Sequence, residues 1–152
     1  MRQEALPNRA LGRGVPAAIG VLEPPLSERS LISIVDDDQS FRDSMRRLLK
    51  SLGYAVAVFP SALEFLASPK ISATACLVAD IHMLSMSGID LYRHLIKKGQ
   101  PIPTILVTAY PDDRVREQLL AEGVDCYLYK PLDESHLIGC LRSAFARGSA
   151  PT

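Results

Sequence analysis

Five short apolar runs recur along the chain from Leu31 onward, separated by segments with helical spacing. The runs are mostly continuous rather than alternating, which is typical of parallel strands covered on both faces. They span residues 31–35, 54–59, 75–79, 104–109 and 126–129. The alternation predicts an α/β fold of five strand–helix units, and because such crossovers are right-handed we expect a doubly wound parallel sheet.

Apolar residues three and four positions apart indicate amphipathic helices between the strands. One helix face contains Phe41, Met45, Leu48, Leu49 and Leu52, and another contains Leu137, Leu141, Ala144 and Phe145. We expect Ser61 and Asp133 to begin helices, since short polar side chains accept hydrogen bonds from the free N–H groups of a first turn. Gly53, Gly99 and Gly123 follow the expected first, third and fourth helices, where glycine favours termination.

The first 29 residues differ from the rest of the chain in composition. They contain four prolines and little sustained periodicity, which indicates a flexible N-terminal extension over 1–29. The folded domain is expected over 30–147, followed by a short tail over 148–152. Since this tail is too short for another domain, we expect the chain to act without an output domain of its own.

Basic and acidic residues are balanced, because 17 Lys+Arg and 17 Asp+Glu give a net charge of about zero. A nucleic-acid-binding domain usually needs a basic stripe, so we expect no direct contact with nucleic acid. The sequence contains no run of about 18 apolar residues and no signal peptide, so we predict a cytoplasmic chain without membrane contact.

Three cysteines, Cys76, Cys126 and Cys140, lie in apolar stretches of sequence. Their number is odd, and the sequence has neither a CxxC motif nor a metal-type Cys/His spacing. We therefore expect buried, reduced thiols rather than a disulfide framework or a metal site.

Polar residues follow the strands at the points where four of them end. Three acids follow the first run, one acid follows the third, a threonine stands at the end of the fourth, and a lysine follows the fifth. Because the carboxyl ends of parallel strands lie at one edge of the sheet, where ligands of open α/β folds bind, we expect these side chains to converge. The residues are Asp36, Asp37, Asp38, Asp80, Thr108 and Lys130.

Each of these features has a structural interpretation when it is taken alone. An acidic cluster before a helix can be an N-cap with favourable charges at the helix dipole, and a Lys–Pro pair can be a simple turn. One cap needs one acid, however, and here three stand in a row. Clustered carboxylates repel one another, and Mg²⁺, which prefers carboxylate oxygens and retained waters, would relieve that repulsion.

Asp80 stands alone at the end of its strand and could act as a nucleophile toward a phosphoryl group, as in aspartyl-phosphate enzymes. The Lys130 ammonium and the Thr108 hydroxyl could hold phosphoryl oxygens. Catalysis would then consist mainly of in-line positioning and charge neutralisation.

The residue patterns of these segments resemble the motifs of the receiver domain of two-component response regulators, and most closely those of the FixJ-like kind. The resemblance extends over 30–147. It implies a flavodoxin-like, CheY-like sheet of five parallel strands in the order 2-1-3-4-5. The segments that carry it are "IVDDD", "LVADIHMLSMSGIDL", "ILVTAY" and "YLYKP".

The resemblance implies that Asp80 takes a phosphoryl group from a sensor histidine kinase or a phosphotransfer protein. Asp37 and Asp80 would bind Mg²⁺ together with the backbone carbonyl of His82, and Asp36 would act mostly through water. Lys130 would hold phosphoryl oxygens. Such a domain is a signalling module rather than an enzyme, although it catalyses its own phosphotransfer and autodephosphorylation.

Thr108 and Tyr127 match the switch positions of the family. On phosphorylation Thr108 would move toward the phosphate and Tyr127 would turn inward, altering the surface formed by the fourth helix, fifth strand and fifth helix. That surface would contact a downstream protein target, and it could also form a homodimer. The Lys130–Pro131 bond is expected to be cis, which a tertiary amide tolerates.

Leu84 departs from the family pattern, in which proline usually stands four residues after the phosphoacceptor. Leucine frees φ and restores a backbone N–H, so we expect a less rigid loop.

An alternative hypothesis is a pseudo-receiver, a constitutive interaction module without a phosphorylation cycle. A flavodoxin-like nucleotide or flavin binder is disfavoured, because the chain lacks a glycine-rich phosphate loop and the expected site is acidic. His82 and Tyr110 occupy positions that tune autodephosphorylation in the family.

Overall fold

The computed structural model describes residues 31–148. The predicted extension over 1–29 and most of the predicted tail over 148–152 lie outside it. The strands are β1 Leu31–Val35, β2 Ala55–Phe59, β3 Thr74–Asp80, β4 Thr104–Thr108 and β5 Cys126–Tyr129. The helices are α1 Gln39–Ser51, α2 Ala62–Ala67, α3 Gly88–Lys97, α4 Asp113–Glu122 and α5 Glu134–Gly148, and a short 3₁₀ helix, η2, spans Pro69–Ala73.

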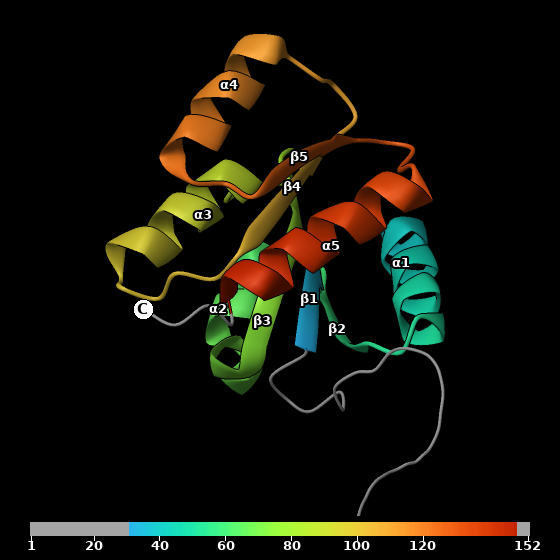
Figure 1. Ribbon diagram of the computed structural model, residues 1–152. Helices are drawn as coiled ribbons and strands as arrows, with labels where there is room; N and C mark the ends of the chain where they lie inside the picture. Colours follow the sequence, from blue (N-terminus) through green and yellow to red (C-terminus); the bar gives the residue numbers. More distant parts are fainter. Residues whose placement is uncertain (1–30, 149–152) are drawn as a thin grey trace, which may run out of the picture.

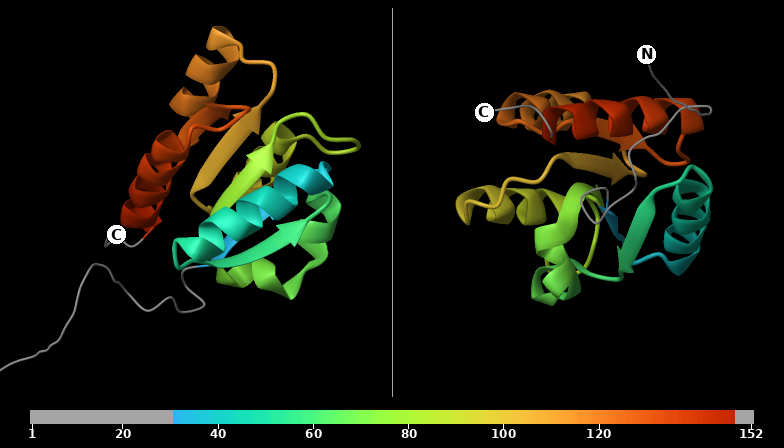
Figure 2. Two further views of the ribbon diagram at one scale, coloured as in Figure 1. Left: turned by 90° about the vertical axis from the view of Figure 1, so that its right-hand side faces the viewer. Right: turned by 60° about the horizontal axis from the view of Figure 1, so that its bottom comes forward.

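All five strands are parallel and form one sheet in the order β2-β1-β3-β4-β5. The predicted doubly wound α/β fold, with strand order 2-1-3-4-5, is therefore confirmed. The sheet runs through the middle of the molecule, and its strands all point the same way, as Figures 1 and 2 show. This arrangement brings the carboxyl ends of the strands to a single edge.

Helices cover both faces of the sheet, and each face has its own buried cluster. Side chains of α2, α3 and α4 pack on one face, whereas those of α1 and α5 pack on the other. Neighbouring residues of β3 show why the apolar runs are continuous: Leu77 belongs to the first cluster, Val78 to the second, and both are buried. Because each such side chain contributes about 1.5–3 kcal/mol on burial, both faces stabilise the fold.

Helix boundaries follow the polar and glycine positions of the sequence. The Ser61 hydroxyl accepts a hydrogen bond from Glu64 N (3.1 Å) at the start of α2. The Asp133 carboxylate accepts from His136 N (3.1 Å) at the start of α5. Gly123 ends α4 with a φ of 114°, a left-handed conformation that costs glycine little. The predicted starts at Ser61 and Asp133 and the predicted end at Gly123 are therefore confirmed.

The expectation of three reduced thiols is wrong for two of the cysteines. Cys126 of β5 and Cys140 of α5 form a disulfide, with Cα atoms 6.0 Å apart. Cys76 alone has a free thiol in the described range, and it is buried as expected. The sequence hides the pair because its members are 14 positions apart and meet only when α5 packs on β5.

Candidate functional site

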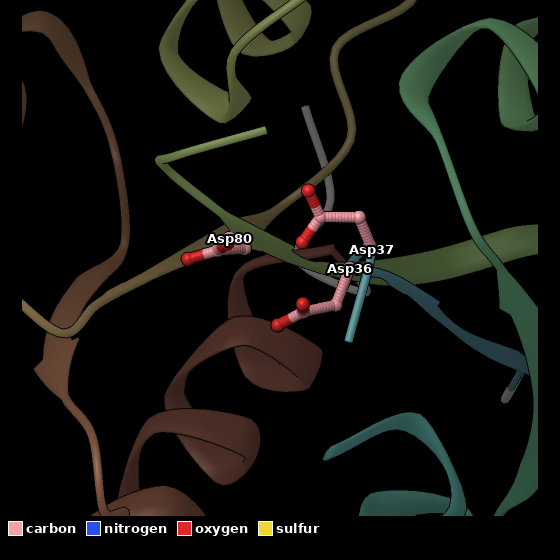
Figure 3. Close-up of side chains that lie close together, drawn as sticks. All are labelled: Asp36, Asp37 and Asp80. Atoms are coloured by element: carbon pink, nitrogen blue, oxygen red, sulfur yellow. The ribbon is translucent and has the colours of Figure 1, made fainter. Parts of the chain in front are cut away.

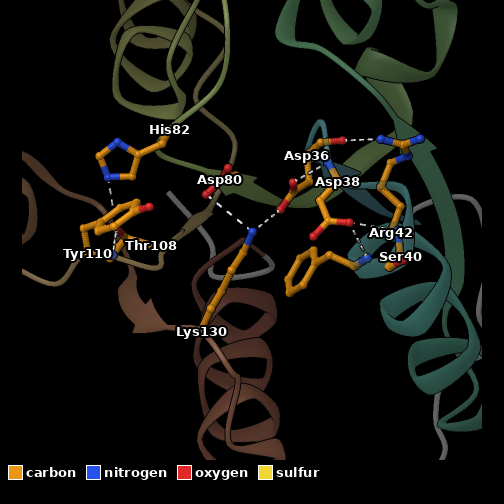
Figure 4. A network of polar contacts seen from close by, with 10 residues as sticks. Asp36, Asp38, Ser40, Arg42, Asp80, His82, Thr108, Tyr110 and Lys130 are labelled. Carbon is orange, nitrogen blue, oxygen red and sulfur yellow. Dashed lines mark hydrogen bonds and ion pairs between the residues drawn. The ribbon is translucent and has the colours of Figure 1, made fainter.

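Strand pairing brings the predicted polar residues to one edge of the sheet. Val35 of β1 lies beside Ala79 of β3, so Asp36 and Asp80 both emerge at the next position along their strands. Asp80 lies in turn beside Val107 of β4, one residue before Thr108. Lys130 follows β5 directly and points at the two acids, as Figure 4 shows.

Three carboxylates meet at this edge. Asp36, Asp37 and Asp80 each offer an oxygen, and these oxygens lie within 4.8 Å of one another. Figure 3 shows the three side chains close together. Asp36 and Asp80 are buried, whereas Asp37 is exposed and open to ligands from the solvent side. A set of hard oxygen donors with one solvent-facing member fits Mg²⁺, which keeps several of its waters when bound by proteins. The donor set therefore agrees with the predicted metal.

Lys130 supplies the positive charge of the cluster. Its Nζ donates to Asp36 Oδ2 at 2.8 Å and lies 3.7 Å from Asp80 Oδ1. The same ammonium lies 4.3 Å from the centre of the Phe41 ring, within the range of a cation–π contact. Burial disfavours the charged amine, but the hydrogen bond and charge of Asp36, followed by the charge of Asp80, outweigh it and raise the pKa of Lys130.

The electrostatics of Asp80 show that its charge is not fully compensated. Burial raises the pKa of Asp80, the neighbouring Asp36 carboxylate raises it further, and Lys130 opposes both effects only in part. A backbone N–H from His82 also stabilises the ionised form. An acid in this position gains if further positive charge arrives, which is the property that a cation-dependent reaction needs.

Asp36 is held by its neighbours at the start of α1. Asp38 N donates to Asp36 Oδ1 at 2.8 Å, and the Arg42 guanidinium donates to the Asp36 carbonyl at 2.6 Å (Figure 4). Asp38 also caps α1, since its carboxylate accepts from Ser40 N at 3.0 Å. The sequence pattern indicated no site role for Arg42 and placed Phe41 only on a helix face. Their position in the first turn after the acidic run is the one feature of the sequence that points to the site.

Thr108 lies on the other side of Asp80, and two groups hold its hydroxyl. His82 Nε2 lies 3.2 Å from Thr108 Oγ1, and Tyr110 N donates to the same oxygen at 2.9 Å (Figure 4). The His82 and Tyr110 rings meet edge to face, with centroids 5.2 Å apart. The imidazole of His82 thus contacts the threonine rather than the carboxylate cluster.

The loop after Asp80 is shaped by a glycine. A side chain at Gly88 would collide with the Asp80 carbonyl oxygen, so only glycine fits where α3 begins beneath the site. Gly88 N donates to the Ile81 carbonyl at 3.1 Å, which closes the loop. Leu84 lies on this loop with 83% of its surface exposed. The expected loss of rigidity at Leu84 stays a prediction.

Tyr127 lies inside the fold, 7% exposed, with its hydroxyl accepting a hydrogen bond from Asp112 N at 3.1 Å. This bond joins the middle of β5 to the residue that caps α4. The Lys130–Pro131 peptide bond is cis, in agreement with the prediction. Tyr127 thus joins β5 to the start of α4, and Lys130 follows the same strand at the carboxylate edge. We define the α4–β5–α5 surface as the exposed surface shared by α4, β5 and α5.

Within residues 31–148, each helix is too short or too polar to cross a lipid bilayer.

Comparison with known families gives a match over most of the described range. Residues 32–142 match the family described as response regulator receiver domain. The response regulator protein TodT of Pseudomonas putida is 35% identical over 120 residues, which are 78% of this chain and 53% of TodT. The transcriptional regulatory protein FixJ of Bradyrhizobium diazoefficiens is 31% identical over 120 residues, 78% of this chain and 58% of FixJ. The chain thus spans about half the length of the curated relatives it matches.

Solved structures agree with the sequence relatives. The response regulator StyR superposes with a TM-score of 0.73 at 32% identity, covering 78% of this chain and 60% of StyR. The structure named FixJ-N superposes with a TM-score of 0.70 at 29% identity, covering 80% of this chain and 97% of that one. Both sequence and fold therefore lead to the same family.

Proposed function

The chain belongs to the response regulator receiver domain family, and from this premise we propose that Asp80 accepts a phosphoryl group in a Mg²⁺-dependent reaction. Receiver domains are signalling domains of two-component systems that are phosphorylated on an aspartate. They generally bind Mg²⁺ at an acidic pocket and interact with histidine kinases and downstream targets. The proposal assigns these general properties to particular residues of this chain.

The observation that carries the proposal is the position of Asp80 between like and unlike charges. Its carboxylate ends β3, lies beside Asp36 and Asp37, and has the Lys130 ammonium 3.7 Å from Oδ1. A buried acid arranged only for stability would have its charge balanced, whereas burial and Asp36 together raise the pKa of Asp80. This excess of negative charge supports a cation-dependent role.

In the proposed reaction, an Asp80 carboxylate oxygen attacks the phosphorus of a phosphohistidine. The P–N bond breaks as the new P–O bond forms, its electron pair stays on the imidazole of the donor, and Asp80 becomes an acyl phosphate. Lys130 is placed to hold an oxygen of the phosphoryl group by leaving part of its contact with Asp36. Thr108 would turn its hydroxyl toward another oxygen, giving up His82.

Asp37 and Asp80, with the backbone carbonyl of His82, would hold Mg²⁺, and Asp36 would act mostly through water. When bound, Mg²⁺ supplies positive charge that offsets the repulsion between the carboxylates and the incoming phosphoryl oxygens. The contacts of Asp36 support this role, because Lys130 and Asp38 N bond its carboxylate and Arg42 bonds its backbone carbonyl.

Thr108 and Tyr127 are proposed to carry the signal to the α4–β5–α5 surface. Withdrawal of the Thr108 hydroxyl from His82 and Tyr110 N would change the start of the segment that leads to α4. A change in that segment would reach Tyr127 through the hydrogen bond that its hydroxyl accepts from Asp112 N. A downstream protein, or a second copy of this chain, would bind the altered surface.

The test treats the full chain with acetyl phosphate and Mg²⁺ and records its intact mass. We expect a mass increase of one phosphoryl group on the wild type and none on Asp80→Asn. Asp90→Asn is the matched control, because Asp90 is an exposed acid on α3, and it should be phosphorylated like the wild type. Removing Mg²⁺ with EDTA should abolish the adduct.

Two results would overturn the proposal. One is an unmodified wild-type chain under these conditions, which would favour the pseudo-receiver hypothesis. The other is an adduct that persists in Asp80→Asn, which would move the acceptor to another residue.

A further inference from the structure

Cys126 and Cys140 lie away from the carboxylate site, on the α4–β5–α5 surface. The proposed phosphotransfer does not use them. Both are half-buried, and both line a pocket of about 400 Å³ that follows the outer edge of β5 between α4 and α5. Their disulfide therefore lies at the wall of a surface pocket rather than in the core.

The neighbourhood of the pair is open to small molecules. Gly139, which precedes Cys140 on α5, is exposed, and a side chain added there would have no atom within 4 Å. Ser143, one turn further along α5, lines the same pocket and is exposed. The thiol of Cys76, in contrast, is fully buried in β3. This burial, followed by the charge of Asp125, raises the pKa of Cys76. Of the three cysteines, Cys126 and Cys140 are therefore the ones that a solute in the pocket can reach.

The charged groups that line the pocket favour the thiolate form of a cysteine over the neutral thiol. Arg116 from α4 and His136 from α5 line it from opposite sides, and both are exposed. Asp125 is the acid of the lining, but its side chain is 4% exposed and lies 3.3 Å from Arg147 Nε. A positive group on the same pocket wall, here the Arg116 guanidinium, stabilises a thiolate, and the thiolate is the species that attacks a disulfide.

We propose that Cys126 and Cys140 form a reversible redox site that exchanges with low-molecular-weight disulfides of the glutathione class. One cysteine thiolate attacks a sulfur of glutathione disulfide, whose S–S bond breaks and releases one glutathione thiolate. The second cysteine then attacks the mixed disulfide and releases the second. Two cysteine thiols become one disulfide, one glutathione disulfide becomes two glutathiones, and the leaving thiolates take up the two protons that the cysteines lose.

The redox state would act on the surface by fixing α5 to β5. Leu137 and Leu141 bury their side chains in the cluster that α5 shares with α1 and the sheet. Cys140 adds a covalent bond from the neighbouring part of the helix to the first residue of β5. Reduction leaves the buried contacts in place but removes the tether, so α5 and the pocket wall become more mobile without loss of the fold.

The test uses the full chain, reduced with dithiothreitol, freed of reductant and then incubated with glutathione disulfide under native conditions. Free thiols are alkylated in denaturant after acid quenching and counted by mass spectrometry. We expect three alkylated cysteines in the reduced chain and one, Cys76, after incubation. A chain that keeps three thiols, stops at a stable mixed disulfide, or resists dithiothreitol without denaturant would overturn the proposal.

Variants separate the two chemical steps. Cys140→Ser should stop at a mixed disulfide with glutathione on Cys126, and Cys126→Ser should stop likewise on Cys140. Cys76→Ala should close the disulfide like the wild type. Loss of closure in Cys76→Ala, with the fold verified by circular dichroism, would contradict the assignment of the pair.

Hydrogen exchange tests the effect on the surface. We expect amides of α5 to exchange about tenfold faster in the reduced chain, because the tether that limits local opening is gone. Amides of β1 and β3 next to the carboxylate site should keep their rates. Equal exchange of α5 in the two redox states would show that the disulfide has no conformational role.

Discussion

Two regions of this molecule bury a carboxylate in different ways. At the amino ends of the strands, Asp125 precedes β5 with a side chain that is 4% exposed. It accepts a hydrogen bond from Thr104 N at 3.0 Å and lies 3.3 Å from Arg147 Nε, so one acid has one cation and one N–H. At the carboxyl ends, Asp36 and Asp80 share the ammonium of Lys130, and the carboxylate of Asp37 lies beside them.

Charge balance, rather than burial, distinguishes the two sites. A buried acid with a matched partner stabilises the position of a loop or strand and needs no further cation. A cluster with excess negative charge costs stability unless a cation joins it. The second kind of site is therefore the one suited to bind Mg²⁺ and a phosphoryl group.

Removing the cation of the carboxyl-end cluster should have the largest effect on stability. In Lys130→Met, the Asp36 carboxylate stays buried beside Asp80 without its 2.8 Å partner. We expect the free energy of unfolding to fall by about 3 kcal/mol in metal-free buffer at pH 7. Urea unfolding followed by circular dichroism measures it.

Lys97→Met is the matched control, because Lys97 is an exposed lysine near the end of α3. Its unfolding free energy should stay within about 0.5 kcal/mol of the wild type. A similar small change in Lys130→Met would mean that Asp36 does not depend on the ammonium.

Removing a negative charge from the same cluster should raise the free energy of unfolding rather than lower it. Because the pKa of Asp80 in the fold is raised above its ordinary value of 3.8, the folded chain holds more protons than the unfolded chain just above that pH. The free energy of unfolding therefore decreases as pH rises through this window. We expect metal-free Asp80→Asn to be more stable than the wild type at pH 7, by less than Lys130→Met loses.

Urea unfolding at a series of pH values checks this sign. The gain of Asp80→Asn should shrink as pH falls toward 3.8, because the carboxyl of the folded wild type takes up its proton above that pH. Asp125→Asn, in the balanced site, should show no gain at pH 7. A gain of equal size in both variants would remove the distinction between the two regions.

The smallest effect is expected at the balanced site itself. Arg147→Ala removes the ion pair with Asp125, but the Arg147 side chain is 56% exposed and Asp125 keeps its bond from Thr104 N. Solvent screening limits the loss of unfolding free energy to about 0.5–1 kcal/mol. Mg²⁺ affinity, measured by NMR titration, should not change, and a weakened affinity would show that the two ends are coupled.

Much of the fold could be predicted because the local signals and the packing agree. The continuous apolar run that contains Leu77 and Val78 predicts a strand buried on both faces, and the sheet uses it in that way. Asp80 and Lys130 could be predicted as neighbours because parallel strands place their carboxyl ends together. Their roles in phosphotransfer stay predictions.

Other contacts depend on how helices sit on the sheet and left little trace in the sequence. Phe41 lies against the Lys130 ammonium only because α1 and the end of β5 approach each other in space. Arg42 reaches the Asp36 carbonyl by the turn of the chain into α1. The expectation of reduced thiols was wrong for the same reason, since Cys126 and Cys140 meet only when α5 packs on β5.

The amino-acid sequence predicted the strands, the strand order through its family resemblance, and the edge where Asp80 and Lys130 meet. The strands and the shared edge follow from short-range patterns, because side-chain burial has a period and strand ends have a direction. The pairing of each acid with its cation and the pairing of Cys126 with Cys140 came from the three-dimensional packing. Those pairings depend on distances of a few ångströms between elements far apart in sequence, and no local pattern encodes such distances.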